Sequence, residues 1–82
     1  MRPTPADMQF DHDLDALGLL CPLPVLKARK RLAALASGQV LRVQADDPAA
    51  VIDVPHFCTE AGHELVTVEA ADAHRNYYIR KA

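Results

Sequence analysis

Alternating hydrophobic and polar positions predict four β-strands along the chain. In the first, the even positions from Met8 through His12 to Leu14 share one side, and the odd positions make a mostly acidic solvent face. The other candidate strands are rich in the aliphatic and β-branched residues that sheets favour. The expected strands are residues 8–15, 39–45, 64–70 and 77–80.

Helical spacing of apolar residues predicts a first helix that begins at Pro24. Proline suits the first helical position, where a missing backbone N–H costs no hydrogen bond, and Gly38 is expected to end the helix. Lys27, Lys30 and Arg31 fall outside the apolar stripe. The expected inward-facing residues are Val25, Ala28, Leu32, Leu35 and Ala36.

A second helix is expected over residues 48–61, directly after the acidic pair Asp46-Asp47, which suits a helix start. Gly62 is the expected stop. Pro55 lies inside this segment and is expected to kink or split the helix, because it lacks a backbone donor. The expected inner stripe consists of Val51, Val54, Cys58 and Ala61.

The expected order of elements is βαβαββ, which predicts an α/β (α+β) two-layer sandwich. Strand–helix–strand units favour parallel strands, and the short last connection favours an antiparallel hairpin. We therefore expect a four-stranded mixed sheet with both helices on one face. Residues 1–7 contain two prolines and little apolar content, so we expect a flexible tail there, followed by a single domain at residues 8–82.

The composition narrows the function classes. Of the 82 residues 50% are hydrophobic and 24% are charged, with a net charge of −2, which fits one small soluble domain. No run reaches the roughly 18 apolar residues of a membrane helix, and the first residues lack a secretory signal, so we expect a cytoplasmic protein without membrane contact. A slightly acidic chain repels phosphate, so nucleic acid is not its expected primary partner.

Cys21 is the strongest candidate for chemistry. Pro22 and Pro24 are expected to support it by keeping the approach to the helix extended and stiff. The free N–H groups and positive dipole end of the helix would stabilise a thiolate by about 0.3–2 kcal/mol. That effect would lower the pKa of the thiol from about 8.5 to roughly 7–8. The competing interpretation is a small buried residue at a strand–helix turn.

The second cysteine, Cys58, lies on the apolar stripe of the second helix and is expected in the core. The competing interpretation is a resolving thiol that forms a disulfide with Cys21. A metal site could be drawn from His56, His63 and the two cysteines, but their spacing matches no zinc signature. We expect neither a metal nor a cofactor.

A basic run occupies residues 27–31 of the first helix. Lys27 and Arg31 are expected to steer an acidic partner protein toward the thiol. Two other interpretations stay open for this run, namely a solvated helix face and a surface that contacts RNA.

Several short segments together carry a family resemblance. The first is Cys21-Pro22-Leu23-Pro24, which looks like a C-P-x-P signature. The others span nearly all of the chain after the tail, at residues 14–19, 45–49, 53–55, 57–59, 62–65 and 78–81. With these segments the chain resembles the TusA/SirA-like family of small sulfur carriers, and it is most similar to the TusA branch.

The resemblance implies the two-layer βαβαββ fold and a role for Cys21. In such carriers the cysteine accepts sulfane sulfur as a persulfide from a cysteine desulfurase and passes it to a downstream relay protein. The best-known destination is 2-thiolation of the wobble uridine of certain tRNAs, and relatives serve molybdenum cofactor assembly or sulfur oxidation. Leu20 and Leu23 flank the motif where several relatives carry charged residues, and such an apolar collar is less favourable to a thiolate.

Three functional hypotheses follow from these residues. A sulfur carrier, expected to be monomeric alone, needs an exposed Cys21 and no resolving thiol nearby, so Cys58 should be buried and distant. A non-catalytic regulatory module that binds RNA or protein would depend on the basic run instead. A thiol redox sensor would need the two cysteines within disulfide reach, with Cα atoms less than about 7 Å apart.

Overall fold

Six elements follow one another in the order βαβαββ in the computed structural model, which describes residues 9–82. They are β1 (His12–Asp15), α1 (Leu23–Ala33), β2 (Val40–Ala45), α2 (Ala50–Ala61), β3 (Glu64–Ala70) and β4 (Arg75–Arg80). The expected tail at residues 1–7 and the expected strand residue Met8 lie outside the described residues.

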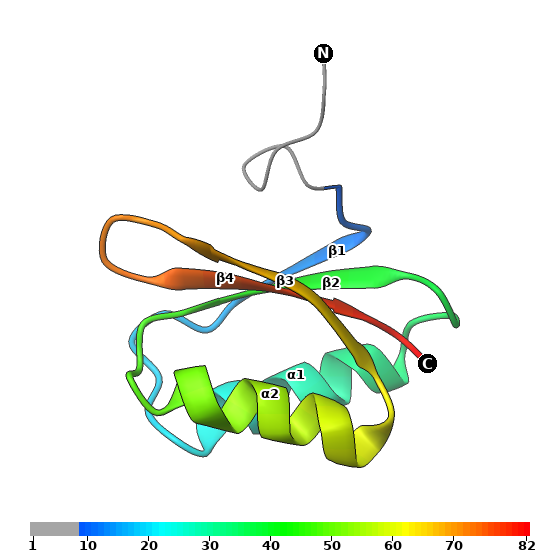
Figure 1. Ribbon diagram of the computed structural model, residues 1–82, viewed down its shortest axis with the longest axis horizontal. Coiled ribbons are helices and arrows are strands. Elements are labelled where there is room, and N and C mark those ends of the chain that lie inside the picture. Colours follow the sequence, from blue (N-terminus) through cyan, green and yellow to red (C-terminus); the bar gives the residue numbers. More distant parts are fainter. Residues whose placement is uncertain (1–8) are drawn as a thin grey trace.

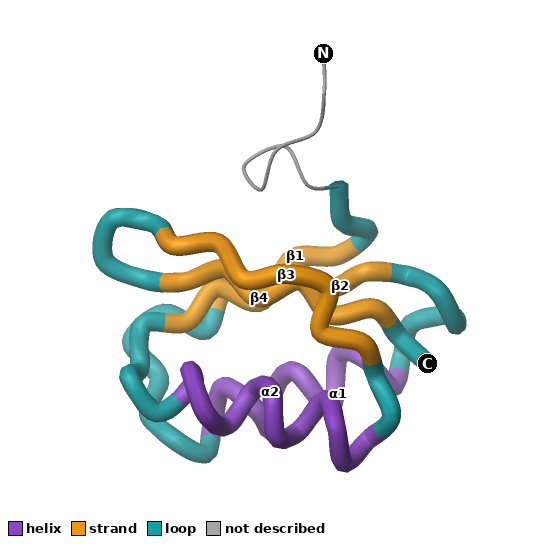
Figure 2. The backbone as a smooth tube through the Cα atoms, in the orientation of Figure 1, coloured by secondary structure: helices purple, strands orange, loops and turns teal. Residues whose placement is uncertain are grey.

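The four strands form one mixed sheet in the order β1-β2-β4-β3. β1 and β2 are parallel, and β4 is antiparallel to both β2 and β3. Both helices lie on the same face of this sheet (Figure 1), so the molecule has two layers, as the tube in Figure 2 shows. The expected fold class and the expected terminal hairpin are therefore confirmed.

Each helix follows one of two parallel strands, so the two helices begin at the same end of the molecule (Figure 1). The core fills the space between them and the sheet. Its largest members on the central strands are Leu41, Val43, Tyr77 and Ile79. The helices contribute Ala28, Leu32, Val54, Phe57 and Cys58. This packing fixes the starts of α1 and α2 relative to each other, and the candidate site lies there.

The bounds of α1 differ from those expected. The helix begins at Leu23, which makes Pro24 its second residue, and it ends at Ala33, well before Gly38. The C-terminal end of α1 is a tightened turn in which the Ala34 amide donates a hydrogen bond to the Arg31 carbonyl at 3.1 Å. Leu35 is still buried as expected, but Ala36 is exposed because the chain has already left the helix.

The inner face of α2 is rotated relative to the expected stripe. Val51 and Ala61 are exposed, while Ala50, Val54, Phe57 and Cys58 are buried. Pro55 neither ends nor splits the helix, which runs without a break from Ala50 to Ala61. Proline removes the donor that would serve the Val51 carbonyl, and because Val51 lies on the solvent side, water can satisfy that group.

The strands match the expected segments with small shifts. β3 has the expected bounds, β2 begins one residue late, and β4 begins two residues early, at Arg75. β1 starts only at His12, and of the described residues on the expected inner side Phe10 and His12 are exposed and Leu14 is buried. Among residues 9–82, no helix has the length and apolar character to cross a membrane.

Candidate functional site

Cys21 lies in the loop between β1 and α1, immediately before the residue that caps the helix, and its side chain is exposed. Pro22 is the N-cap residue, the Cys21–Pro22 peptide bond is cis, and Pro24 is buried in the first helical turn. The approach to the helix is shorter than expected, because Leu23 is already helical and Pro24 is the second residue of α1. The interpretation of Cys21 as a buried packing residue is wrong, because the structure leaves its side chain open to solvent.

Two aspartates from the β2–α2 loop hold this turn in place. The Cys21 amide donates to Oδ2 of Asp47 at 2.6 Å, and the Gly18 amide donates to Oδ1 of Asp46 at 3.0 Å. Oδ1 of Asp47 also accepts from the Ala49 amide at 3.2 Å. The acidic pair thus does more than precede α2. It ties the loop that carries the thiol to the loop that begins the second helix.

A hollow of about 210 Å³ opens beside the thiol, between the starts of the two helices. Cys21, Pro22 and Val25 line it from the α1 side. α2 supplies the other wall along most of its length, from Asp53 in its first turn to Glu60 in its last. The remaining lining residues are Arg29, Asp53, His56, Phe57 and Glu60. Apolar carbon from the proline, valine and phenylalanine therefore meets charged groups from both helices next to one sulfur atom.

The pKa of Cys21 is raised above that of an ordinary thiol, contrary to the sequence-based expectation. The main cause is the Asp53 carboxylate, which accepts a hydrogen bond from the neutral thiol; desolvation and the negative charges of Asp53 and Asp47 add to it. The start of α1 has few free backbone N–H groups that could lower the pKa of Cys21 instead. The Leu23 amide donates to the Leu20 carbonyl at 2.8 Å, and Pro24 has no N–H.

Cys58 is buried in the core, as the sequence predicts, and only 2% of its surface is exposed. Burial raises the pKa of this thiol to about 11. Both cysteines are free thiols. The two histidines of the hypothetical metal set also separate, since His56 lines the hollow beside Cys21 and His63 lines another.

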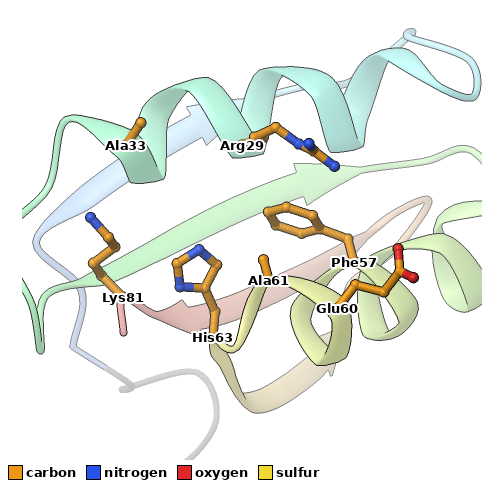
Figure 3. Close-up of a pocket in the computed structure, with 7 residues that line it drawn as sticks. All are labelled: Arg29, Ala33, Phe57, Glu60, Ala61, His63 and Lys81. Atoms are coloured by element: carbon orange, nitrogen blue, oxygen red, sulfur yellow. The ribbon is translucent and has the colours of Figure 1, made fainter.

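That second hollow continues along the seam between the helices (Figure 3). It has a volume of about 450 Å³ and shares Arg29, Phe57 and Glu60 with the first. The Arg29 guanidinium carbon lies 5.4 Å from the centre of the Phe57 ring. The centres of the Phe57 and His63 rings are 5.8 Å apart. Phe57 therefore lines both hollows and contacts a basic side chain through its ring.

Lys27 and Arg31 are not brought to the thiol. They line a separate hollow of about 320 Å³ together with Leu14, Lys30 and Ala34. The Arg31 Nη1 donates to the Asp13 carbonyl at 3.2 Å, on the β1 side of α1. The basic residue that does line the hollow beside Cys21 is Arg29.

Sequence reasoning did not single out Asp53, Arg29 or Phe57 as site residues. The signal that could have found them is the parallel placement of the two expected helices, which brings their first turns together. The exact rotation of each helix decides which side chains then face the thiol. For α2 that rotation differs from the expected stripe, as the exposure of Val51 shows.

The expected apolar collar is present and open to solvent. Leu20 is 68% exposed, and Leu23 and Leu26 on the first turn of α1 are about half exposed. Three exposed aliphatic side chains therefore lie within five residues of Cys21 along the chain. Exposed aliphatic groups of this kind favour contact with another protein surface.

A family profile described as sulfurtransferase TusA matches residues 12–81. The chain belongs to the TusA family. It is also similar to the crystal structure of a SirA-like protein from Desulfitobacterium hafniense, with a TM-score of 0.76 and 28% sequence identity over 85% of this chain and 96% of that chain. Membership of the TusA family gives this chain a general role as a sulfur carrier or sulfurtransferase that works in a relay with other proteins.

Proposed function

We propose that Cys21 accepts sulfane sulfur as a persulfide from a cysteine desulfurase and relays it to an acceptor protein. The Cys21 thiolate attacks the terminal sulfur of the donor's persulfide, a new S–S bond forms on Cys21, and the donor leaves as its thiolate. The acceptor's thiolate then attacks the outer sulfur of the Cys21 persulfide, and Cys21 is released as a thiolate. Both steps are thiol exchanges that need no added oxidant.

The observation that carries this proposal is the contrast between the two cysteines in a TusA-family chain. Cys21 is exposed on a loop held by Asp46 and Asp47, whereas Cys58 is buried in the core. A sulfur carrier requires such a contrast. A second accessible thiol would attack the persulfide and expel the sulfur as sulfide.

We expect Cys21→Ser to abolish sulfur loading and Cys58→Ala to retain it. The protein is incubated with a cysteine desulfurase and cysteine, and intact mass spectrometry counts the added sulfur atoms. Wild type and Cys58→Ala should each gain the mass of one sulfur, which a reducing agent removes. Loading that persists in Cys21→Ser but is lost in Cys58→Ser would overturn the assignment.

For the destination of the sulfur, we propose 2-thiolation of the wobble uridine of tRNA. Support comes from the resemblance of the sequence to the TusA branch, in the segments that follow the Cys-Pro-Leu-Pro motif. A deletion strain should lose thiolated tRNA and regain it with wild type but not with Cys21→Ser. A strain with normal tRNA thiolation and a defect in molybdoenzymes or sulfur oxidation would point to the other known destinations instead.

A further inference from the structure

We propose that the Asp53 carboxylate is a recognition point for a basic side chain on a sulfur-transfer partner, an inference that rests on the function proposed for Cys21. In the free carrier, the Asp53 carboxylate favours the neutral form of the Cys21 thiol over the thiolate. A lysine or arginine that the partner places beside its own reacting sulfur pairs with Asp53 and releases Cys21 as a thiolate. The partner that fits this hollow is a protein with a basic side chain next to its persulfide or thiol.

The geometry that supports this proposal is the placement of carboxylates around one exposed sulfur. Asp53 is half-buried and lines the same hollow as Cys21, from the facing helix. Asp47 lies beside the backbone of Cys21, with its Oδ2 2.6 Å from the amide nitrogen. Asp53 is the main cause of the raised pKa of Cys21, and the negative charge of Asp47 adds to it. A thiolate formed here without a compensating cation would face two like charges.

The other titratable groups of the hollow do not supply that cation. Arg29 is the basic residue that lines it, and its guanidinium lies over the Phe57 ring, 5.4 Å from the centroid. His56 lies 3.5 Å from Glu60, so its charge, when present, is directed to that carboxylate. The basic residues Lys27 and Arg31 line a different hollow.

A partner's cation changes this balance in a defined way. When a cation pairs with Asp53, the carboxylate no longer accepts from the Cys21 thiol and its negative charge is neutralised. The pKa of Cys21 therefore falls, and the thiol proton passes to solvent. Because opposite charges attract and like charges repel in the same hollow, Asp53 also disfavours partners whose reacting sulfur lies beside an acidic residue. Recognition and activation of the thiol thus depend on the same carboxylate.

Charged thiol reagents test this directly and need no partner. We would measure the rate at which Cys21 reacts with the cationic reagent 2-(trimethylammonium)ethyl methanethiosulfonate and with the anionic reagent 2-sulfonatoethyl methanethiosulfonate. Each rate is divided by the rate of the same reagent with the free thiol 2-mercaptoethanol, which corrects for intrinsic reactivity. At low salt the cationic reagent should be favoured by at least about threefold, and the preference should shrink at 1 M salt. Peptide mass spectrometry assigns the modified cysteine.

The decisive variant is Asp53→Asn. It should lower the cation preference at least about twofold and shift the pH midpoint of Cys21 alkylation to lower pH, because the amide carries no negative charge to disfavour the thiolate. Asp53→Glu should keep the preference. The matched control is Asp72→Asn, which removes an exposed carboxylate from the β3–β4 turn and should change neither readout.

Equal rates for the two reagents with the wild type, or an unchanged ratio in Asp53→Asn, would overturn the proposal. Circular dichroism establishes that each variant is folded, and Asp53→Ala replaces Asp53→Asn if the latter does not fold. These reagents need no sulfur donor. A failure of sulfur loading on Cys21 would therefore refute the proposed function and leave the ratio of the two reagent rates as it is. A ratio that Asp53→Asn does not change would refute this inference and leave sulfur loading as it is.

Discussion

At the scale of single residues, the chemistry of Cys21 depends on side chains that are remote in sequence. Asp53 raises the pKa of its thiol, and Asp47, 26 positions away, accepts from its amide. The local sequence predicts the opposite shift, because it shows only the helix start. A carboxylate in contact with the thiol outweighs a helix end whose first amides are bonded or absent.

The two cysteines should differ sharply in reactivity toward iodoacetamide. At pH 8 the native protein should be alkylated at Cys21, while Cys58 should stay unmodified because it is buried and its pKa is raised to about 11. Peptide mass spectrometry measures both sites. In 8 M urea both cysteines should react, which is the control, and equal labelling in the native protein would contradict the burial of Cys58.

Asp47→Ala should destabilise the protein by about 1–2 kcal/mol, because the Cys21 and Ala49 amides lose a charged acceptor. Urea denaturation followed by circular dichroism measures the loss in the free energy of unfolding. Asp72→Ala, which removes an exposed aspartate of the β3–β4 turn, should change that free energy by less than about 0.5 kcal/mol. Equal stability of the two variants would show that the hydrogen bonds accepted by Asp47 contribute nothing to the free energy of unfolding.

At the scale of elements, the ends of the helices are decided by local hydrogen bonds and their faces by packing. α1 ends in a tightened turn, and the Gln39 side chain accepts from the Ala36 amide at 2.8 Å as the chain turns toward β2. α2 ends where the sequence predicts, at Gly62, which has a φ of +80°. The Gly62 position is therefore a place where the residue type itself matters.

Gly62→Ala should lower the free energy of unfolding by about 1 kcal/mol, because a residue with a Cβ atom is disfavoured in the left-handed conformation. An added Cβ would meet no atom within 4 Å, so the cost is conformational and involves no clash. Gly62→Asn should cost less, since asparagine tolerates this conformation better. Urea denaturation compares the three proteins, and a Gly62→Ala protein as stable as the wild type would contradict the argument.

At the scale of the whole molecule, the edge strand β1 is joined to the rest of the sheet through one neighbouring strand, β2. It pairs with β2 over the register from His12 with Leu41 to Asp15 with Gln44. The Asp13 carboxylate reinforces this pairing with two bonds from Arg42, both 2.9 Å long, and one from Gln44 at 3.0 Å. The attachment of β1 also sets the position of the loop that carries Cys21.

The pairing of Asp13 with Arg42 predicts a pH dependence of stability. The bond from Arg42 lowers the pKa of Asp13 below its ordinary value of 3.8. At pH values above 3.8, the lower pKa of Asp13 in the folded protein stabilises the fold. This contribution is lost as the pH falls through the pKa that Asp13 has in the folded protein.

Asp13→Asn should therefore reduce stability at pH 7 by about 0.5–1 kcal/mol, since the pair is partly exposed. Thermal denaturation across pH tests this, and the wild type and Asp13→Asn should converge toward pH 2. Asp72→Asn serves as the control at each pH. A stability difference that stayed constant from pH 7 to pH 2 would argue against an ionic contribution.

Much of this architecture follows from patterns within single segments. The six elements, their order and the terminal hairpin could be predicted because strand alternation and helical spacing are local properties. Val51 and Ala61 were misjudged, and α2 is not split at Pro55, because the rotation of this helix and its continuity depend on what packs against it. Cys21 could be chosen from its neighbours in sequence, whereas Asp53, Arg29 and Phe57 could not.

The sequence by itself determined the order of the elements, the core position of Cys58 and the place of Cys21 before a helix. Those features depend on residues close together along the chain. Only the tertiary structure decided which charges surround the thiol, because parallel β1 and β2 bring the starts of two helices together. The sign of the pKa shift at Cys21 is set across that contact, by carboxylates from the β2–α2 loop and α2.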